Sequence, residues 1–149
     1  MPRPMTEQER EAFLSERRIA VMSLPSDDAR PPLAFPIWYG YQPGGLFTYY
    51  THRTEPKSRK QRLLHEGSGV SLCVQREEIP YKYVTVEGTV TAVDEAPTVE
   101  QMLAIVRRYL SNADAQAYVQ GEMDAGINLV LFSIRPDRWA SFDFSEDAG

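Results

Sequence analysis

The chain has 149 residues, of which 16 are lysine or arginine and 21 are aspartate or glutamate, so its formal net charge is −5 at pH 7. This length suits a single domain over residues 1–149, with a core large enough to fold alone. The acidic balance argues against sequence-independent binding to nucleic acid. The sequence has neither an apolar run long enough to span a membrane nor a hydrophobic signal core, so we expect a cytoplasmic protein.

Residues that carry out covalent chemistry are scarce. The single cysteine, Cys73, lies in an apolar run and cannot form an internal disulfide, so we expect a buried, inert thiol. The sequence shows no Ser/His/Asp set and no metal-ligand spacing, so it predicts no metal site and names no catalytic residue. His52 and His65 are expected at the surface, and only His52 lies near a candidate site.

The first half of the chain combines short strands with two helices. A capping box from Thr6 to Glu9 predicts a helix over residues 7–17. A second helix is expected from Ser58 to about His65, with Gly67 as its C-cap. The β-branched and aromatic runs predict strands over residues 19–24, 33–41 and 46–51, the last two joined by the turn at residues 43–45.

The second half contains the longest strand signal. A strand over 70–75 and a loop over 76–80 precede a strand over 83–94, in which apolar residues alternate with polar ones. Gly88 in its middle indicates a bulge or a close backbone approach. Helices are expected over 98–110 and 114–122, and two final strands over 128–134 and 139–144 around a turn at Pro136 and Asp137.

This order of elements predicts a mainly β (α+β) fold, an antiparallel split β-barrel of about six strands with flanking helices. Strands and helices do not alternate regularly, so a parallel Rossmann sheet is not expected. The sequence also lacks a Gly-rich turn that leads from a strand into a helix.

Basic residues gather between the third strand and the second helix, although the whole chain is acidic. The strand ends in Tyr50 and Thr51, and the helix begins after Ser58. Cations in the first turn of a helix oppose its dipole, so they favour a bound anion there. The alternative is a solvated basic helix face. We interpret the segment as a phosphate site, and its basic residues are Arg53, Lys57, Arg59, Lys60 and Arg62.

Several local motifs, in this order, resemble the FMN-binding split-barrel superfamily of pyridoxamine 5'-phosphate oxidase. The likeness is greatest to small actinobacterial oxidoreductases that use a flavin or the deazaflavin F-420. It covers residues 9–144. Its carriers are Pro36-Ile37-Trp38-Tyr39, Tyr50-Thr51 with Ser58-Arg59-Lys60, Val70-Ser71-Leu72, the run from Tyr83 to Gly88, and the run from Ile134 to Trp139.

The resemblance implies a cofactor, F-420 or FMN, and residues that bind it. Tyr50 and Thr51 would lie beside the cofactor phosphate, which Ser58, Arg59 and Lys60 would hold, with Lys57 as an additional cation. The ring edge would lie along Pro36, Ile37 and Trp38, and Tyr83 would lie near the pyrimidine end of the ring. The site would form at the interface of a homodimer. These expected cofactor-binding residues are Pro36, Ile37, Trp38, Tyr50, Thr51, Lys57, Ser58, Arg59, Lys60 and Tyr83.

The implied activity is hydride transfer between F-420 or FMN and a small conjugated substrate, with Lys82 or Tyr83 as candidate proton donors. The chain departs from many relatives after the second helix, where it reads Leu64-His65-Glu66-Gly67-Ser68-Gly69 instead of a basic Arg-Arg-Asp-Pro segment. It also lacks the C-terminal residues with which the oxidase grips its pyridoxal substrate. This argues against vitamin B6 oxidation.

Two other functions remain open from the sequence. A non-enzymatic flavin- or haem-binding split barrel would need an axial ligand if it held haem, and the available histidines are His52 and His65. A small barrel that binds single-stranded nucleic acid would use Tyr49, Tyr50, His52 and Arg53. The expectation of a homodimer has its own support, because one small domain would struggle to cover Tyr39, Tyr41, Tyr49, Trp139, Phe142 and Phe144.

Overall fold

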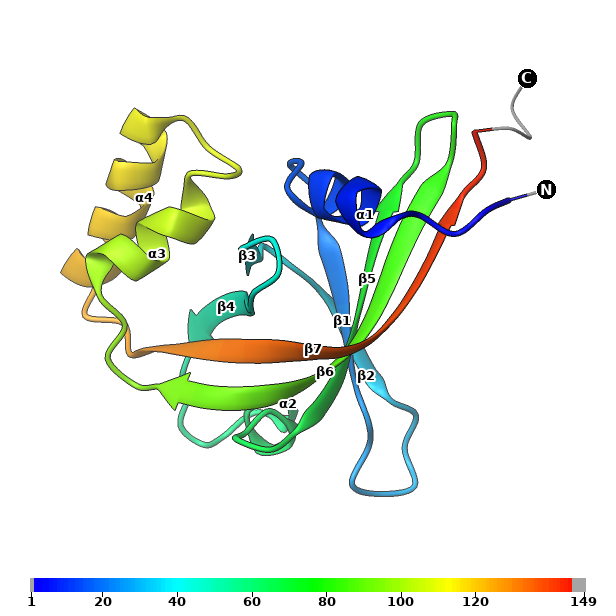
Figure 1. Cartoon of the computed structure of the whole chain (residues 1–149). Coiled ribbons are helices and arrows are strands. Elements are labelled where there is room, and N and C mark those ends of the chain that lie inside the picture. Colours follow the sequence, from blue (N-terminus) through cyan, green and yellow to red (C-terminus); the bar gives the residue numbers. More distant parts are fainter. Residues whose placement is uncertain (1, 146–149) are drawn as a thin grey trace.

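The computed structural model describes residues 2–145, and its seven strands form one antiparallel sheet in the order β2-β1-β5-β6-β7-β4-β3 (Figure 1). The fold is therefore the mainly β split barrel that the sequence predicts, with seven strands where about six were expected. The strands are β1 (Ala20–Leu24), β2 (Leu33–Ile37), β3 (Gly40–Tyr41), β4 (Phe47–His52), β5 (Gly69–Arg76), β6 (Lys82–Asp94) and β7 (Leu129–Asp143).

Within residues 2–145, four helices flank the curled sheet. They are α1 (Glu7–Leu14), α2 (Arg59–Leu63), α3 (Val99–Val106) and α4 (Asn112–Asp124). Helices α3 and α4 lie together at one end of the sheet, and α1 lies toward the other end (Figure 1). No helix in residues 2–145 has the length and apolar character needed to cross a membrane.

Capping boxes begin three of these helices, including the one that the sequence predicts at Thr6. Thr6, Ser58 and Thr98 each accept a hydrogen bond from the backbone N–H three residues later, and the side chain there returns a bond. Helix α1 ends at Leu14 and not at Arg17. The Leu14 carbonyl accepts hydrogen bonds from the Tyr39 hydroxyl and the Arg108 guanidinium, both at 2.8 Å, so tertiary contacts hold this end.

The strand expected over 33–41 is divided in two. Trp38 stacks on Tyr109, with ring centroids 4.8 Å apart and 6° between the planes. The Tyr39 N–H donates to the Tyr109 hydroxyl at 3.0 Å and not to a neighbouring strand. The chain therefore leaves β1 after Ile37 and pairs with β4 as the short strand β3.

The last two expected strands are one strand, β7, so the turn predicted at Pro136 and Asp137 is wrong. Gly88 pairs with Pro136 and Glu87 pairs with Arg138, which leaves Asp137 as the extra residue of a bulge. A bulge tolerates proline because the ladder is already interrupted there. Gly88 is required at this point, since a Cβ would lie 2.7 Å from the Arg135 carbonyl oxygen.

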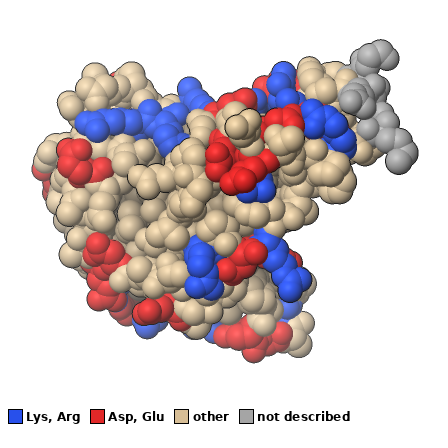
Figure 2. Space-filling model, in the orientation of Figure 1, with Lys and Arg blue, Asp and Glu red and all other residues tan. Residues whose placement is uncertain are grey.

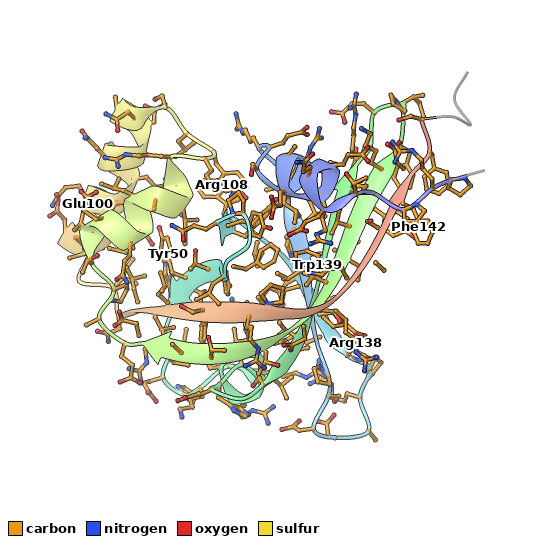
Figure 3. The ribbon with its side chains drawn as sticks, in the orientation of Figure 1. Tyr50, Glu100, Arg108, Arg138, Trp139 and Phe142 are labelled. Atoms are coloured by element: carbon orange, nitrogen blue, oxygen red, sulfur yellow. The ribbon has the colours of Figure 1, made fainter. Side chains whose placement is uncertain are left out.

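The core fills the concave side of the sheet, and a second cluster lies under α3 and α4. Tyr39 is fully buried and Tyr49 is 6% exposed, so one chain covers both without a partner. Trp139, Phe142 and Phe144 remain partly exposed (Figure 3 labels the first two). Cys73 is half-buried on the outer face of the sheet, between Val21 and Thr85, so the prediction of a buried thiol is wrong.

Candidate functional site

A cavity of about 210 Å³ lies where the barrel splits. β2 and β3 are the two edges of the sheet, and β3 pairs with β4 only at Phe47 and Thr48. Past Thr48, this edge of β4 pairs with no strand of the described chain and faces the cavity. The lining residues are Pro36, Ile37 and Trp38 from the β2 end, Tyr49, Tyr50, Thr51 and His52 from β4, and Ile105, Tyr118 and Glu122 from α3 and α4.

The structure therefore brings together five of the residues that the sequence proposes for a cofactor. They are Pro36, Ile37, Trp38, Tyr50 and Thr51. They come from two strands that are far apart in the sheet order but converge at its open seam. Strand edges supply free backbone N–H and C=O groups, which suit a flat, polar-edged ligand.

Lys60 connects α2 to this cavity. Its ammonium donates hydrogen bonds to the Tyr49 hydroxyl at 3.0 Å and the Thr51 hydroxyl at 3.1 Å, and both of these residues line the cavity. It also lies 4.9 Å from the ring centroid of Phe35. Lys60 is half-buried and forms no ion pair with a carboxylate in residues 2–145. Within residues 2–145, hydroxyl dipoles and the quadrupoles of aromatic rings therefore contact this charge.

The other predicted phosphate ligands are arranged differently. Ser58 is committed to the cap of α2, and Lys57 is exposed. The Arg59 guanidinium donates to the Pro31 carbonyl at 2.7 Å and the Ser26 hydroxyl at 3.2 Å, so it binds the β1–β2 loop. Its Nε is shielded from solvent and has no hydrogen-bond partner in the described chain.

Two further members of the basic segment are neutralised. Arg53 pairs with Glu95 at 3.3 Å, and Arg62 pairs with Asp27 at 3.3 Å. Helix α2 has only five residues, so its dipole adds little to anion binding. Within the described part of this segment, Lys60 is the cation whose ammonium bonds two residues of the cavity wall.

Tyr83 does not line this cavity. Its ring packs against Phe142, with centroids 5.6 Å apart, and against Tyr81 and Phe144. The neighbouring Lys82 lies 3.8 Å from Asp143. Both residues thus belong to an aromatic cluster at the β5–β6 hairpin end of the sheet, separate from the cavity within one chain.

The sequence analysis missed a hydrogen-bonded group in the cavity wall. The Tyr50 hydroxyl donates to Glu122 Oε1 at 2.6 Å, and His52 Nε2 lies 3.1 Å from Glu122 Oε2. Glu122 is 8% exposed. Burial, followed by the hydrogen bond to this carboxylate, raises the pKa of Tyr50 well above its ordinary value.

A helical pattern could have revealed Glu122. Ala115, Tyr118, Val119 and Glu122 follow the i, i+3, i+4, i+7 spacing that places residues on one helix face. Ala115 and Val119 are buried against α3, so the same face directs Glu122 inward. A carboxylate on an apolar face is a signal of function, because it needs hydrogen-bond partners once it is buried.

The comparisons with known proteins agree with this architecture. A family model described as pyridoxamine 5'-phosphate oxidase matches residues 6–143. The chain belongs to this family. No functionally curated protein matches the sequence of this chain significantly.

Several solved structures have the fold of this oxidase-family chain. An F420 reductase is 21% identical with a TM-score of 0.64, over 87% of this chain and 94% of that one. The conserved hypothetical protein Rv2991 from Mycobacterium tuberculosis is 21% identical with a TM-score of 0.73, over 94% and 86%. A FAD and heme binding protein from Mycobacterium smegmatis is 18% identical with a TM-score of 0.67, over 95% and 72%. At these identities the likeness shows the fold.

Proposed function

We propose that this chain is an oxidoreductase that uses F-420 or FMN to transfer hydride to or from a small conjugated substrate. The observation that carries the proposal is Lys60, a half-buried ammonium that has no carboxylate partner among residues 2–145 and donates to Tyr49 and Thr51 in the cavity wall. A partly desolvated charge is costly unless an opposite charge compensates it. A phosphate placed there would accept hydrogen bonds from the ammonium and the Thr51 hydroxyl.

The residues of the cavity fit such a cofactor. Lys60 and Thr51 would hold its phosphate, and the neighbouring Arg59 has a buried Nε without a hydrogen-bond partner in the described chain that a second phosphate oxygen would satisfy. Pro36, Ile37 and Trp38 would present backbone groups and an apolar edge to its ring. When bound, the cofactor supplies the hydride chemistry, and the chain positions it and excludes water.

The roles of Ser58, Lys57 and Tyr83 remain part of the proposal. Ser58 sets the start of α2 and so places Lys60, and Lys57 offers an exposed cation for an acidic cofactor tail. Tyr83 is far along the sheet from the cavity of its own chain, and it would reach a cofactor only in a neighbouring subunit.

We propose that the protein is a homodimer whose two subunits together complete each site. The cavity of one chain, about 210 Å³, is below the range of about 300–1,000 Å³ typical of ligand pockets. The half-exposed aromatic cluster around Tyr83 and Phe142 offers a surface that a second copy would cover. On this view the assembly acts in the cytoplasm on a small-molecule substrate.

The mixture of surface charges favours a small molecule over nucleic acid as the binding partner. Basic and acidic side chains are interspersed on the face shown in Figure 2. Tyr49, one of the rings that would stack on a base, is 6% exposed and packs on Phe132 with ring centroids 6.2 Å apart. It is unavailable for base stacking.

Titration of the apo-protein with F-420, FMN and riboflavin tests the proposal. We expect F-420 or FMN to bind and riboflavin, which lacks the phosphate, to bind at least about tenfold more weakly. Reduced cofactor should then be oxidised by quinones, enones or tetrapyrroles faster than in a protein-free control. If no phosphorylated cofactor binds, the proposal is wrong.

The second candidate is a non-enzymatic flavin- or haem-binding protein, favoured by the fold shared with the FAD and heme binding protein. Each histidine that could serve as an axial ligand already has one ring nitrogen in a hydrogen bond. His52 Nε2 lies 3.1 Å from Glu122 Oε2, and His65 Nδ1 lies 3.1 Å from the Glu66 carbonyl oxygen. A haem protein should show a Soret band that the variant lacking both histidines loses. Cofactor binding without oxidation by any acceptor would favour a carrier.

A further inference from the structure

Glu122 is a buried carboxylate that the proposed cofactor contacts leave unused. It lies in the cavity wall with 8% exposure, and its hydrogen-bond partners in the described chain are the Tyr50 hydroxyl and His52 Nε2. It forms no ion pair with lysine or arginine in residues 2–145. A carboxylate accepts about four hydrogen bonds, so acceptor positions remain for a ligand.

Two aromatic residues, Trp38 and Tyr118, line the same cavity as this carboxylate. Tyr118 lies one turn earlier on α4 and lines the same cavity, although its side chain remains substantially exposed. Its ring centroid lies 5.7 Å from that of Trp38, at an angle of 42°. Two aromatic rings beside a carboxylate form an environment that attracts a planar cation through ring quadrupoles and charge.

The cavity is thus bordered by opposite charges on the two faces of β4. Tyr49 and Thr51 point toward the Lys60 ammonium, whereas Tyr50 and His52 point toward Glu122. Alternate side chains of a strand lie on opposite faces, so the strand itself separates the two charges. In Figure 3, Tyr50 lies between β4 and the helices α3 and α4.

From this arrangement we infer that Glu122, Tyr118 and Trp38 form a subsite for a planar substrate with a protonated or N–H-bearing ring nitrogen. The inference rests on the proposed function, since it assigns a substrate class to the same cavity. The phosphate of the cofactor would lie beside Lys60, and the substrate nitrogen would donate to Glu122. A neutral or anionic conjugated compound of the same shape would bind more weakly.

Two probes of matched shape test the subsite. 4-Aminoquinoline, which is protonated at its ring nitrogen at neutral pH, is a quinolinium cation with a ring N–H donor, and 1-aminonaphthalene is its neutral counterpart. Binding is measured by fluorescence titration of the protein with each probe, with and without FMN. We expect the quinolinium to bind about tenfold to a hundredfold more tightly, the range of a charge-assisted contact.

Variants separate this role from a structural one. Glu122→Gln keeps the size of the side chain and an acceptor for Tyr50, and it should remove the preference for the cation. Glu100→Gln is the control, because it removes the same charge from the exposed surface of α3 and should preserve the preference. Tyr118→Leu should weaken the quinolinium several-fold while leaving Glu122 in place.

An equal preference in wild type and Glu122→Gln overturns the inference, as does weak or unselective binding of both probes to wild type. The outcome is independent of the cofactor proposal. If the quinolinium preference follows Glu122 but neither F-420 nor FMN binds, the subsite stands and the proposed function fails. If a cofactor binds without that preference, the subsite alone fails.

Discussion

The hydroxyl of Tyr50 and the carboxylate of Glu122 join β4 to α4 through a hydrogen bond of 2.6 Å. This contact spans 72 positions of the sequence and fixes the helix that forms one wall of the cavity. Glu122 is buried and Tyr50 is half-buried, so water would compensate the loss of this bond only in part.

Tyr50→Phe should therefore destabilise the fold. Removing the hydroxyl leaves Glu122 with one partner fewer, at a cost of about 1–3 kcal/mol in the free energy of unfolding. Urea unfolding followed by circular dichroism measures this change. The control is Tyr81→Phe, because the Tyr81 hydroxyl makes only a long contact of 3.4 Å with Gln75 near the surface. Equal stabilities for the two variants would contradict the prediction.

Alkaline pH should lower the stability of the protein through partly or fully buried tyrosines, one of which is Tyr50. Burial raises the pKa of both Tyr39 and Tyr50 above the ordinary value. The neutral phenol is thus favoured in the folded state, and the stabilisation is present below the unfolded pKa of about 10 and is lost as pH rises above it. The free energy of unfolding should fall from about pH 10 upward, and less steeply in Tyr50→Phe. A pH-independent stability between pH 9 and about pH 11 would refute this.

The bulge at Asp137, opposite Gly88, allows a second test of stability. Gly88→Ala places a Cβ against the backbone carbonyl of Arg135, so the strand must shift, and we expect a loss of about 1–3 kcal/mol. Gly121→Ala, in α4 with open space around the new Cβ, should instead stabilise by about 0.5–1 kcal/mol. Thermal unfolding of both variants measures the contrast. Similar effects of the same sign would show that the bulge is not constrained.

Much of the fold follows from local patterns. The capping box at Thr6, the alternation along β6 and the bulge at Gly88 are all confirmed, because each depends on neighbours in the sequence. The turn expected at Pro136 and Asp137 was wrong because a non-local contact decides the conformation there. Pro and Asp favour turns locally, and only pairing with β6 shows that Asp137 is an extra residue in a continuous strand.

The candidate site, like the fold, could be predicted from the sequence only in part. The segments around Trp38 and Thr51 were predicted together, and the structure places them on one cavity. Which cations remain free could not be predicted, because the partners of Arg53 and Arg62 are brought near by folding. The contact between Glu122 and Tyr50 likewise depends on the docking of α4, which no local pattern encodes.

The proposed homodimer is tested by its mass in solution. Light scattering at micromolar concentration should give about twice the mass of one chain, because the subunits are expected to share the cofactor sites. The measurement is repeated with the bound cofactor. A monomer that retains full cofactor affinity would contradict the shared site.

The most direct test of the account is the affinity of F-420 and FMN for Lys60→Ala, compared with wild type and with Arg62→Ala. Lys60 has no carboxylate partner in the described chain, whereas Arg62, on the same helix, is paired with Asp27 of the β1–β2 loop. The account predicts that Lys60→Ala weakens the phosphorylated cofactor about tenfold or more and leaves riboflavin unaffected, while Arg62→Ala changes neither. Unchanged affinity for F-420 and FMN in a folded Lys60→Ala protein would contradict it.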